Sequence, residues 1–151
     1  MDVIGRGVIA GFLATLALSA VIDPMTTVAR IGDLLPPIFA WILHFFVGSF
    51  IWGAAFALLQ PCMRGPFWLR GLVFGAAAWL IVMIAVLPFT RAGWFGLDLG
   101  LATPAIMLLV HLAYGALVGS IFGALGPRQG EAHPHGGAPD ESNNELHPLP
   151  R

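Results

Sequence analysis

The chain has 151 residues, of which 58% are hydrophobic and 10% are charged, whereas an ordinary soluble domain carries about 25% charged residues. Its mean hydropathy is +0.84. Residues 1–127 contain five arginines and four aspartates but no basic patch that could hold a phosphate backbone. These features exclude a soluble globular enzyme, a disordered protein and a nucleic-acid-binding protein. They predict an integral membrane protein whose surroundings are the lipid bilayer.

Four apolar stretches are long enough to cross about 30 Å of hydrocarbon, which takes roughly 20 helical residues. They cover Gly7–Ala29, Ile38–Leu59, Gly71–Thr90 and Pro104–Leu125. Their length and continuous apolar character predict an all-α integral membrane fold, because barrel strands are shorter and alternate in polarity. We expect one transmembrane domain over residues 1–126. The polar tail, residues 127–151, is rich in Pro, Gly, His and acids and is predicted to be disordered.

The arginines predict the orientation of the chain. Arg6, Arg64, Arg70 and Arg128 lie on the side shared by the N-terminus, the second connection and the C-terminus, and Arg30 and Arg91 lie on the other. This bias favours both termini in the cytoplasm of a bacterial inner membrane. A signal peptide is the alternative at the N-terminus, but the apolar run continues to Ala29, which favours a retained span. Cys62, the single cysteine, is then in a reducing compartment.

Two motifs recur along the chain in the same order. The pattern Arg-Gly-x-x-x-Gly at Arg6–Gly11 returns at Arg70–Gly75, 64 residues later. A proline, a histidine seven residues on and a glycine four residues further on occur at Pro37, His44 and Gly48, and again at Pro104, His111 and Gly115. We therefore predict two repeats of two helices, over about residues 6–59 and 70–125. Because each repeat crosses twice, the repeats are parallel, with a pseudo-two-fold axis along the membrane normal.

Small residues predict where these helices pack, since helix association in lipid depends on close backbone contact. The packing positions are Gly7, Gly11, Gly48, Gly53, Gly71, Gly75, Gly115, Gly119 and Gly123. Ser49 and Ser120 lie beside such glycines without a nearby base, and we interpret them as packing residues. Asp98, in a glycine-rich connection, is predicted to be a surface residue.

Three ionisable side chains fall inside the predicted spans: Asp23, His44 and His111. Each histidine lies seven residues inside its helix, roughly 10 Å deep, and Asp23 lies roughly 9 Å from the same surface. Gly48 and Gly115 follow the histidines by one turn, so the histidines are expected to face the bundle. Tyr114, one turn from His111, extends this predicted intramembrane polar layer.

The polar layer allows several interpretations, because buried ionisable groups in a membrane are costly and often functional. We favour a structural role in which the side chains hydrogen-bond between helices, with no enzymatic activity and no cofactor. A transition metal at His44, His111 and Asp23 is one alternative. A haem held by His44 and His111 is another, and a proton-coupled carrier or channel for a small solute is a third. Self-association is expected, and the sequence does not identify a small-molecule ligand.

Several of these runs carry a resemblance to a known family. They are Trp41–Gly48 and Trp52-Gly53 in the second span, Arg70–Gly75 in the third, Gly93–Gly96 in a connection and His111–Gly115 in the fourth. Over about residues 5–126, the chain resembles an uncharacterised family of small bacterial inner-membrane proteins with a domain of unknown function. The resemblance implies a four-span fold in that membrane and no particular activity.

Overall fold

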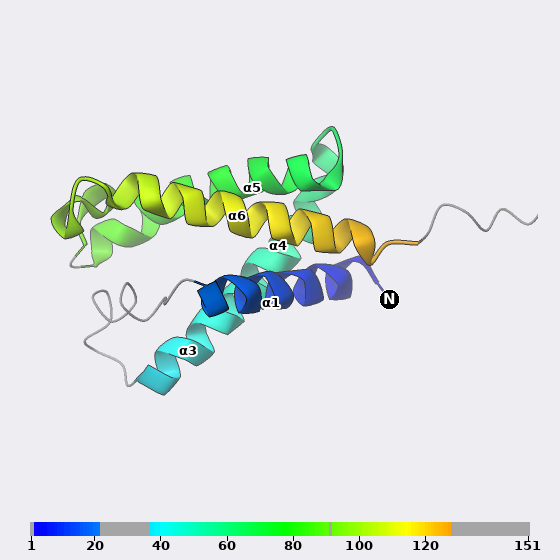
Figure 1. The fold of residues 1–151 in the computed structure, drawn as a ribbon, viewed down its shortest axis with the longest axis horizontal. Helices are drawn as coiled ribbons and strands as arrows, with labels where there is room; N and C mark the ends of the chain where they lie inside the picture. The colour runs from blue at the N-terminus through cyan, green and yellow to red at the C-terminus, as the bar shows by residue number, and fades with distance from the viewer. Residues whose placement is uncertain (1, 22–36, 91, 128–151) are drawn as a thin grey trace, which may run out of the picture.

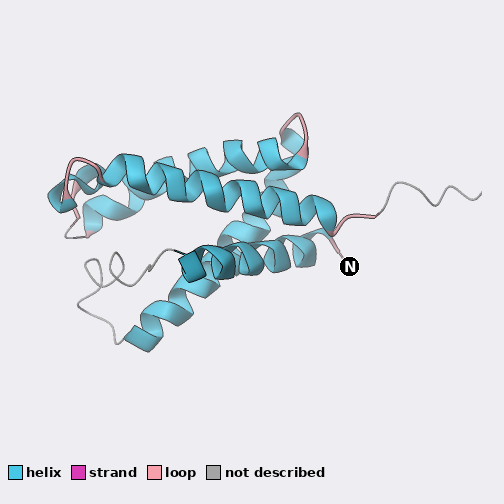
Figure 2. Ribbon diagram, viewed as in Figure 1, coloured by secondary structure: helices cyan, strands magenta, loops and turns pink. Residues whose placement is uncertain are grey.

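The computed structural model describes residues 2–21, 37–90 and 92–127 of the chain. In these ranges all regular structure is helical, as predicted, and no strand occurs (Figure 2). The α-helices are α1 (Val3–Val21), α3 (Pro37–Phe46), α4 (Ala54–Leu59), α5 (Phe67–Ile81) and α6 (Thr103–Ala124). Asp23 and the C-terminal tail, for which the sequence makes predictions, lie outside the described residues.

Two of the spans are long helices that change their hydrogen-bond pattern along their length. The π-helix η1 (Val47–Gly53) joins α3 to α4, and the 3₁₀ turn η2 (Gln60–Cys62) follows. After α5 come the π-helix η3 (Val82–Val86) and the 3₁₀ turn η4 (Leu87–Phe89). A further 3₁₀ segment, η5 (Trp94–Leu99), lies in the connection to α6. The sequence predicted none of these departures from α-helical geometry.

Four helices in the described part of the chain are long and apolar enough to cross a membrane. They cover Val3–Val21, Trp41–Cys62, Phe67–Phe89 and Thr103–Ala124. The first begins before the predicted Gly7 because the Asp2 carboxylate accepts a hydrogen bond from the Gly5 N–H at 3.1 Å and caps the helix. Pro37 and Pro104 lie in the first turns of α3 and α6, which confirms the predicted helix starts.

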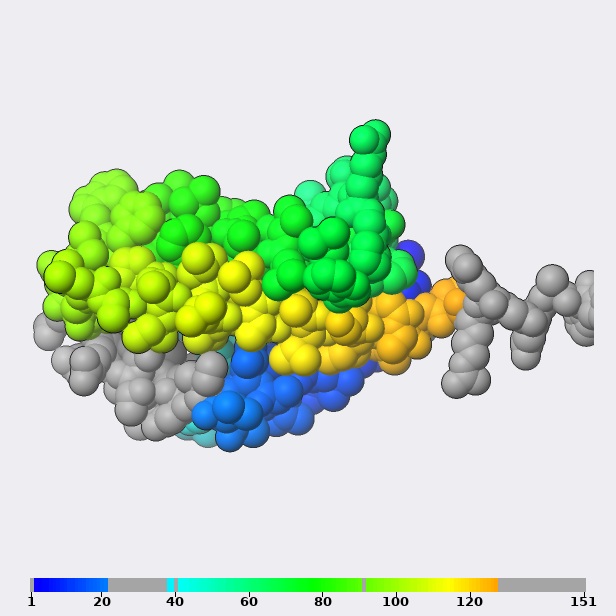
Figure 3. All heavy atoms as spheres, turned by 45° about the horizontal axis from the view of Figure 1, so that its top comes forward, coloured from blue at the N-terminus to red at the C-terminus, as the bar shows by residue number. Residues whose placement is uncertain are grey.

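The N-terminus, the connection between α4 and α5, and the end of α6 lie at one end of the molecule (Figure 1). Helix α6 lies between α5 and α1 and contacts both, as the ribbon and the space-filling view show (Figures 1 and 3). Helix α3 diverges from the other helices, and its contacts are with α1 and η1. The divergence leaves one side of α3 and η1 uncovered by the described part of the chain.

The interior of the bundle is narrow. Three alanines, Val118 and three phenylalanines form its main core, where the Phe56 ring meets the rings of Phe74 and Phe122 edge-on, each at a centroid distance of 5.4 Å. Large aliphatic side chains lie mostly on the outside; Leu58 is 62% exposed and Leu109 is 68% exposed. A protein in water buries such side chains. Their outward placement fits helices surrounded by hydrocarbon.

The helices meet through glycine. A Cβ atom at Gly71 would collide with the backbone carbonyl of Gly115, and a Cβ at Gly115 would collide with that of Gly71. Gly7 and Gly53 face each other in the same reciprocal way between α1 and η1. Gly11, Gly75 and Gly119 also meet the backbone of a neighbouring helix, whereas Gly48 and Gly123 meet the side chains of Thr15 and Phe67. Close backbone contact therefore holds both hairpins together.

A second, smaller core closes the end of the bundle that carries η5. Met83, Leu87 and Ala92 are buried there. The Trp79 indole N–H donates a hydrogen bond to the Pro104 carbonyl at 3.1 Å and so joins α5 to the first turn of α6. Asp98 is exposed in this connection, which confirms its prediction as a surface residue.

The glycine contacts predict the effect of adding a side chain at the interface between α5 and α6. Gly71→Val forces its methyl groups against the Gly115 backbone, which cannot rotate away, so unfolding should become easier by about 1–3 kcal/mol. Ala77→Val, on the exposed face of the same helix, is the matched control and should leave stability nearly unchanged. Thermal unfolding of the detergent-purified protein measures both effects. Equal stability of the two variants would contradict the interface described here.

Candidate functional site

His44 links two helices of the first hairpin. Its ring is half-buried on α3, and Nε2 lies 3.1 Å from the Ser19 hydroxyl oxygen on α1. The rings of Trp41 and Phe45 meet the imidazole edge-on at centroid distances of 6.0 and 5.8 Å. His44 therefore contacts both a polar partner on α1 and an aromatic group on its own helix.

His111 has a different environment. It is half-buried on α6, and its Nδ1 atom lies 2.7 Å from the Met107 carbonyl oxygen of the same helix. A carbonyl accepts but cannot donate, so Nδ1 carries a proton; in the neutral ring, Nε2 then holds the lone pair. The His111 backbone packs directly against Gly75 of α5.

Tyr114 connects the two hairpins. Its hydroxyl, on α6, donates a hydrogen bond to the Gly48 carbonyl in η1, 66 residues away in sequence. The Thr15 side chain of α1 lies beside both groups, and its own hydroxyl donates to the Gly11 carbonyl at 2.8 Å. Three elements, α1, η1 and α6, thus meet around the hydroxyl of one half-buried tyrosine.

The described residues bring only part of the predicted polar layer together. Tyr114 reaches Gly48, one turn beyond His44, but His44 and His111 each bond to another partner and not to one another. Where side chains are described, no three His, Cys, Asp or Glu residues gather closely enough to hold a metal ion. Because Asp23 lies outside the described residues, the complete layer stays a prediction.

Two arginines have contacts that the sequence did not predict. The Arg6 guanidinium donates to the Phe122 carbonyl at 2.7 Å and lies 4.2 Å from the centroid of the Phe122 ring. Arg70 donates to the Gln60 side-chain oxygen at 2.8 Å and to the Gly65 carbonyl at 2.7 Å. Both cations lie near the carboxyl-terminal end of another span, where they offset the helix dipole. The Arg-Gly-x-x-x-Gly motif, which contains both arginines, was the available signal; it predicts the repeats, and its arginines predict the orientation, but neither predicts these contacts.

Ser49 also has a feature that the sequence did not predict. It is buried, 2% exposed, as a packing residue should be. Its hydroxyl oxygen, however, has no hydrogen-bond partner among the described residues. A buried polar group without a partner is uncommon and calls for a physical explanation.

One comparison with known proteins gives a match. The model of a family described as a family of unknown function, DUF6789, matches residues 1–133. No curated protein and no solved structure matches the chain.

The contact between Tyr114 and Gly48 predicts a coupling between the hairpins. Tyr114→Phe removes the hydroxyl but keeps the ring, so the free energy of unfolding should fall by about 1 kcal/mol. Thr15→Val removes the neighbouring hydroxyl. A double-mutant cycle in detergent should give a non-zero coupling energy between the two changes, because the side chains are adjacent. Strict additivity, with no loss of stability in Tyr114→Phe, would show that this polar contact does not join the hairpins.

Proposed function

The chain belongs to DUF6789, a family of unknown function. From its own residues, we propose that it is a structural or interaction component of a membrane. In this proposal it is a small multi-pass protein of the bacterial inner membrane. The exposed apolar side chains of all four long helices support the bilayer as its surroundings. The polar residues within the spans then serve helix association and not catalysis.

The hydrogen bond from Tyr114 to the Gly48 carbonyl is the observation that carries this proposal. It ties α6 to η1, just as the contact between His44 and Ser19 ties α3 to α1. Intramembrane polar side chains commonly stabilise helix association in this way, by about 0.6–2 kcal/mol each. Helix-to-helix links of this kind are what a structural role requires.

We also propose that the four spans are two parallel repeats related by a pseudo-two-fold axis. Arg6 in the first span binds the end of the fourth, and its repeat counterpart Arg70, in the third span, binds the end of the second. The equivalent glycines Gly7 and Gly71 also each meet a glycine of the next span, Gly53 and Gly115, although the repeat pairs Gly115 with Gly48 and not with Gly53. A two-fold relation exchanges the first span with the third and the second with the fourth, so these matching contacts support it.

A metal or haem site is the second candidate, and the tautomer of His111 favours it. With the Nδ1 proton directed to the Met107 carbonyl, the lone pair of Nε2 is available to a metal. An imidazole oriented by such a bond is the usual form of a histidine ligand. His44 and Asp23 complete this candidate set.

One preparation separates the two candidates. The full chain, purified in detergent, should show no visible absorption band and no stoichiometric metal by elemental analysis, because the structural role needs neither. A haem band or one metal per chain that is lost in His111→Ala would instead establish the second candidate. His133→Ala, in the tail, is the control for metal bound outside the membrane. If the metal is lost only in His133→Ala, the metal binds to the tail, and the structural role of the membrane-spanning residues is not contradicted.

The proposed orientation can be tested with the natural cysteine. Cys62 is exposed in η2, at the end of the molecule that carries the N-terminus, and the arginine bias predicts that this end lies in the cytoplasm. A membrane-impermeant maleimide should label Cys62 in inverted vesicles but not in intact spheroplasts. The matched control is the double variant Cys62→Ser, Leu101→Cys. Leu101 is 89% exposed and lies at the opposite end of the molecule. The double variant should reverse the pattern, whereas labelling of both positions from one side would contradict the orientation.

A further inference from the structure

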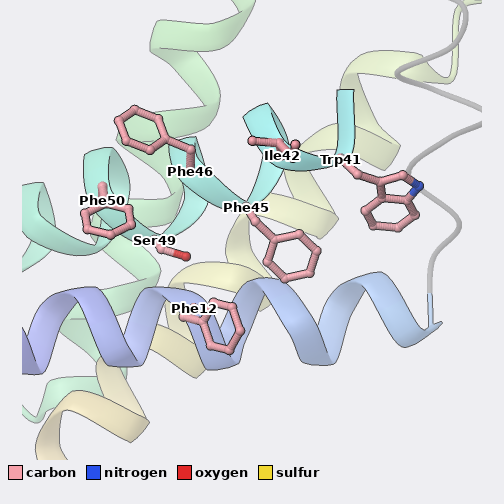
Figure 4. A pocket seen from close by; sticks show the side chains of 7 residues that line it. All are labelled: Phe12, Trp41, Ile42, Phe45, Phe46, Ser49 and Phe50. Carbon is pink, nitrogen blue, oxygen red and sulfur yellow. The ribbon is translucent and has the colours of Figure 1, made fainter. Parts of the chain in front are cut away.

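A groove of about 420 Å³ runs between α1 and the diverging helix α3 with η1. It is lined by Phe12, Trp41, Ile42, Phe45, Phe46, Ser49 and Phe50 (Figure 4). Phe12 extends from α1, and the other six belong to α3 and η1. Ile42, Phe46 and Phe50 are each at least half exposed. The groove therefore opens on the outer surface of the helices, which faces lipid in the membrane.

The Ser49 hydroxyl is the polar group of this groove. Figure 4 shows it directed toward the space between the Phe12 and Phe45 rings. Serine and threonine hydroxyls in helices ordinarily donate to the carbonyl four residues earlier, as Thr15 does to Gly11. Ser49 has no such partner among the described residues, although it is 2% exposed. The hydroxyl thus lies just beneath the aromatic and aliphatic wall of the groove, where a ligand reaches it once a wall side chain turns aside.

The depth of Ser49 restricts what can accept this hydrogen bond. Its helix begins at Pro37, and twelve residues at 1.5 Å each place Ser49 roughly 18 Å from that end. In a hydrocarbon layer of about 30 Å, this position is close to the middle. The phosphate and ester groups of a phospholipid stay at the membrane surface and do not reach it. The acceptor must belong to a molecule whose polar group can itself enter the hydrocarbon.

We infer that the groove binds a lipid-soluble quinone, a flat ring bearing carbonyl oxygens and a hydrocarbon tail. One carbonyl accepts the Ser49 O–H, which supplies the missing partner. The ring packs among the aromatic side chains, where Phe12 and Phe45 lie 5.6 Å apart and the Trp41 ring stacks on Phe45 at 6.0 Å. The tail follows the exposed rings of Phe46 and Phe50, stacked at 5.3 Å. The inference is independent of the structural role proposed for Tyr114 and His44, because it uses neither side chain.

Titration of the detergent-purified full chain with decylubiquinone tests the inference. Quinones quench tryptophan fluorescence, and Trp41 lines the groove, so quenching should saturate; Trp41→Phe should remove the saturable component. Ser49→Ala should weaken binding about fivefold, the value of one hydrogen bond. Ser120→Ala, which removes an exposed hydroxyl from α6, is the matched control and should bind like the wild type. Phe45→Leu, which removes the stacked ring, should also weaken binding.

Decylbenzene, a ring with the same tail but no carbonyl, distinguishes the hydrogen bond from simple burial. It should bind the wild type and Ser49→Ala equally. The inference is overturned if decylubiquinone binds both forms with the same affinity, or if Ser120→Ala weakens binding as much as Ser49→Ala. It is also overturned if quenching never saturates and native mass spectrometry finds a phospholipid or a second copy of the chain instead. The melting temperature of each variant, measured in the same detergent, verifies that it is folded.

Discussion

The contact of one helix backbone with another at glycine is the constraint on which this structure depends. Apolar side chains gain nothing by leaving lipid for a protein interior, so helices associate through close packing and through polar contacts. At Gly71 and Gly115, and at Gly7 and Gly53, each residue lies where a side chain would enter the facing backbone. Large side chains are consequently displaced outward, and the interior keeps room for alanines and a few phenylalanine rings.

A narrow interior also determines how polar groups are used. With the helices so close, the Tyr114 hydroxyl can cross from α6 to the Gly48 carbonyl without a bridging partner. At the end of the bundle, where the last carbonyls of a helix lack partners within it, Arg6 reaches from α1 to the Phe122 carbonyl and covers the Phe122 ring. The glycine contacts fix the distance between helices, and the polar contacts fix which residues face each other.

Hydropathy predicted the four long helices because the thickness of the bilayer, and not the details of packing, sets their length. Pro37 and Pro104 predicted two helix starts for a local reason. Proline has no backbone N–H, and the N–H groups of the first helical turn have no partner within the helix, so nothing is lost there. The partners of His44 and His111 could not be predicted in this way. They depend on the direction in which each side chain leaves its helix. A sequence argument derives that direction from a constant repeat of 3.6 residues per turn. The same assumption hid the unpaired hydroxyl of Ser49.

The π-helix η1 explains why that assumption fails in the second span. Successive contacts with α1 come from His44, Gly48, Gly53 and Ala57, at intervals of four, five and four residues. Thirteen residues of unbroken α-helix make about 3.6 turns, whereas these contacts require three. The wider π turn, with hydrogen bonds five residues apart, keeps all four residues toward α1. The same turn contains Ser49, whose hydroxyl has no partner among the described residues. Single π turns occur often at functional sites, and here one turn aligns the glycines with α1 and contains the unpaired hydroxyl.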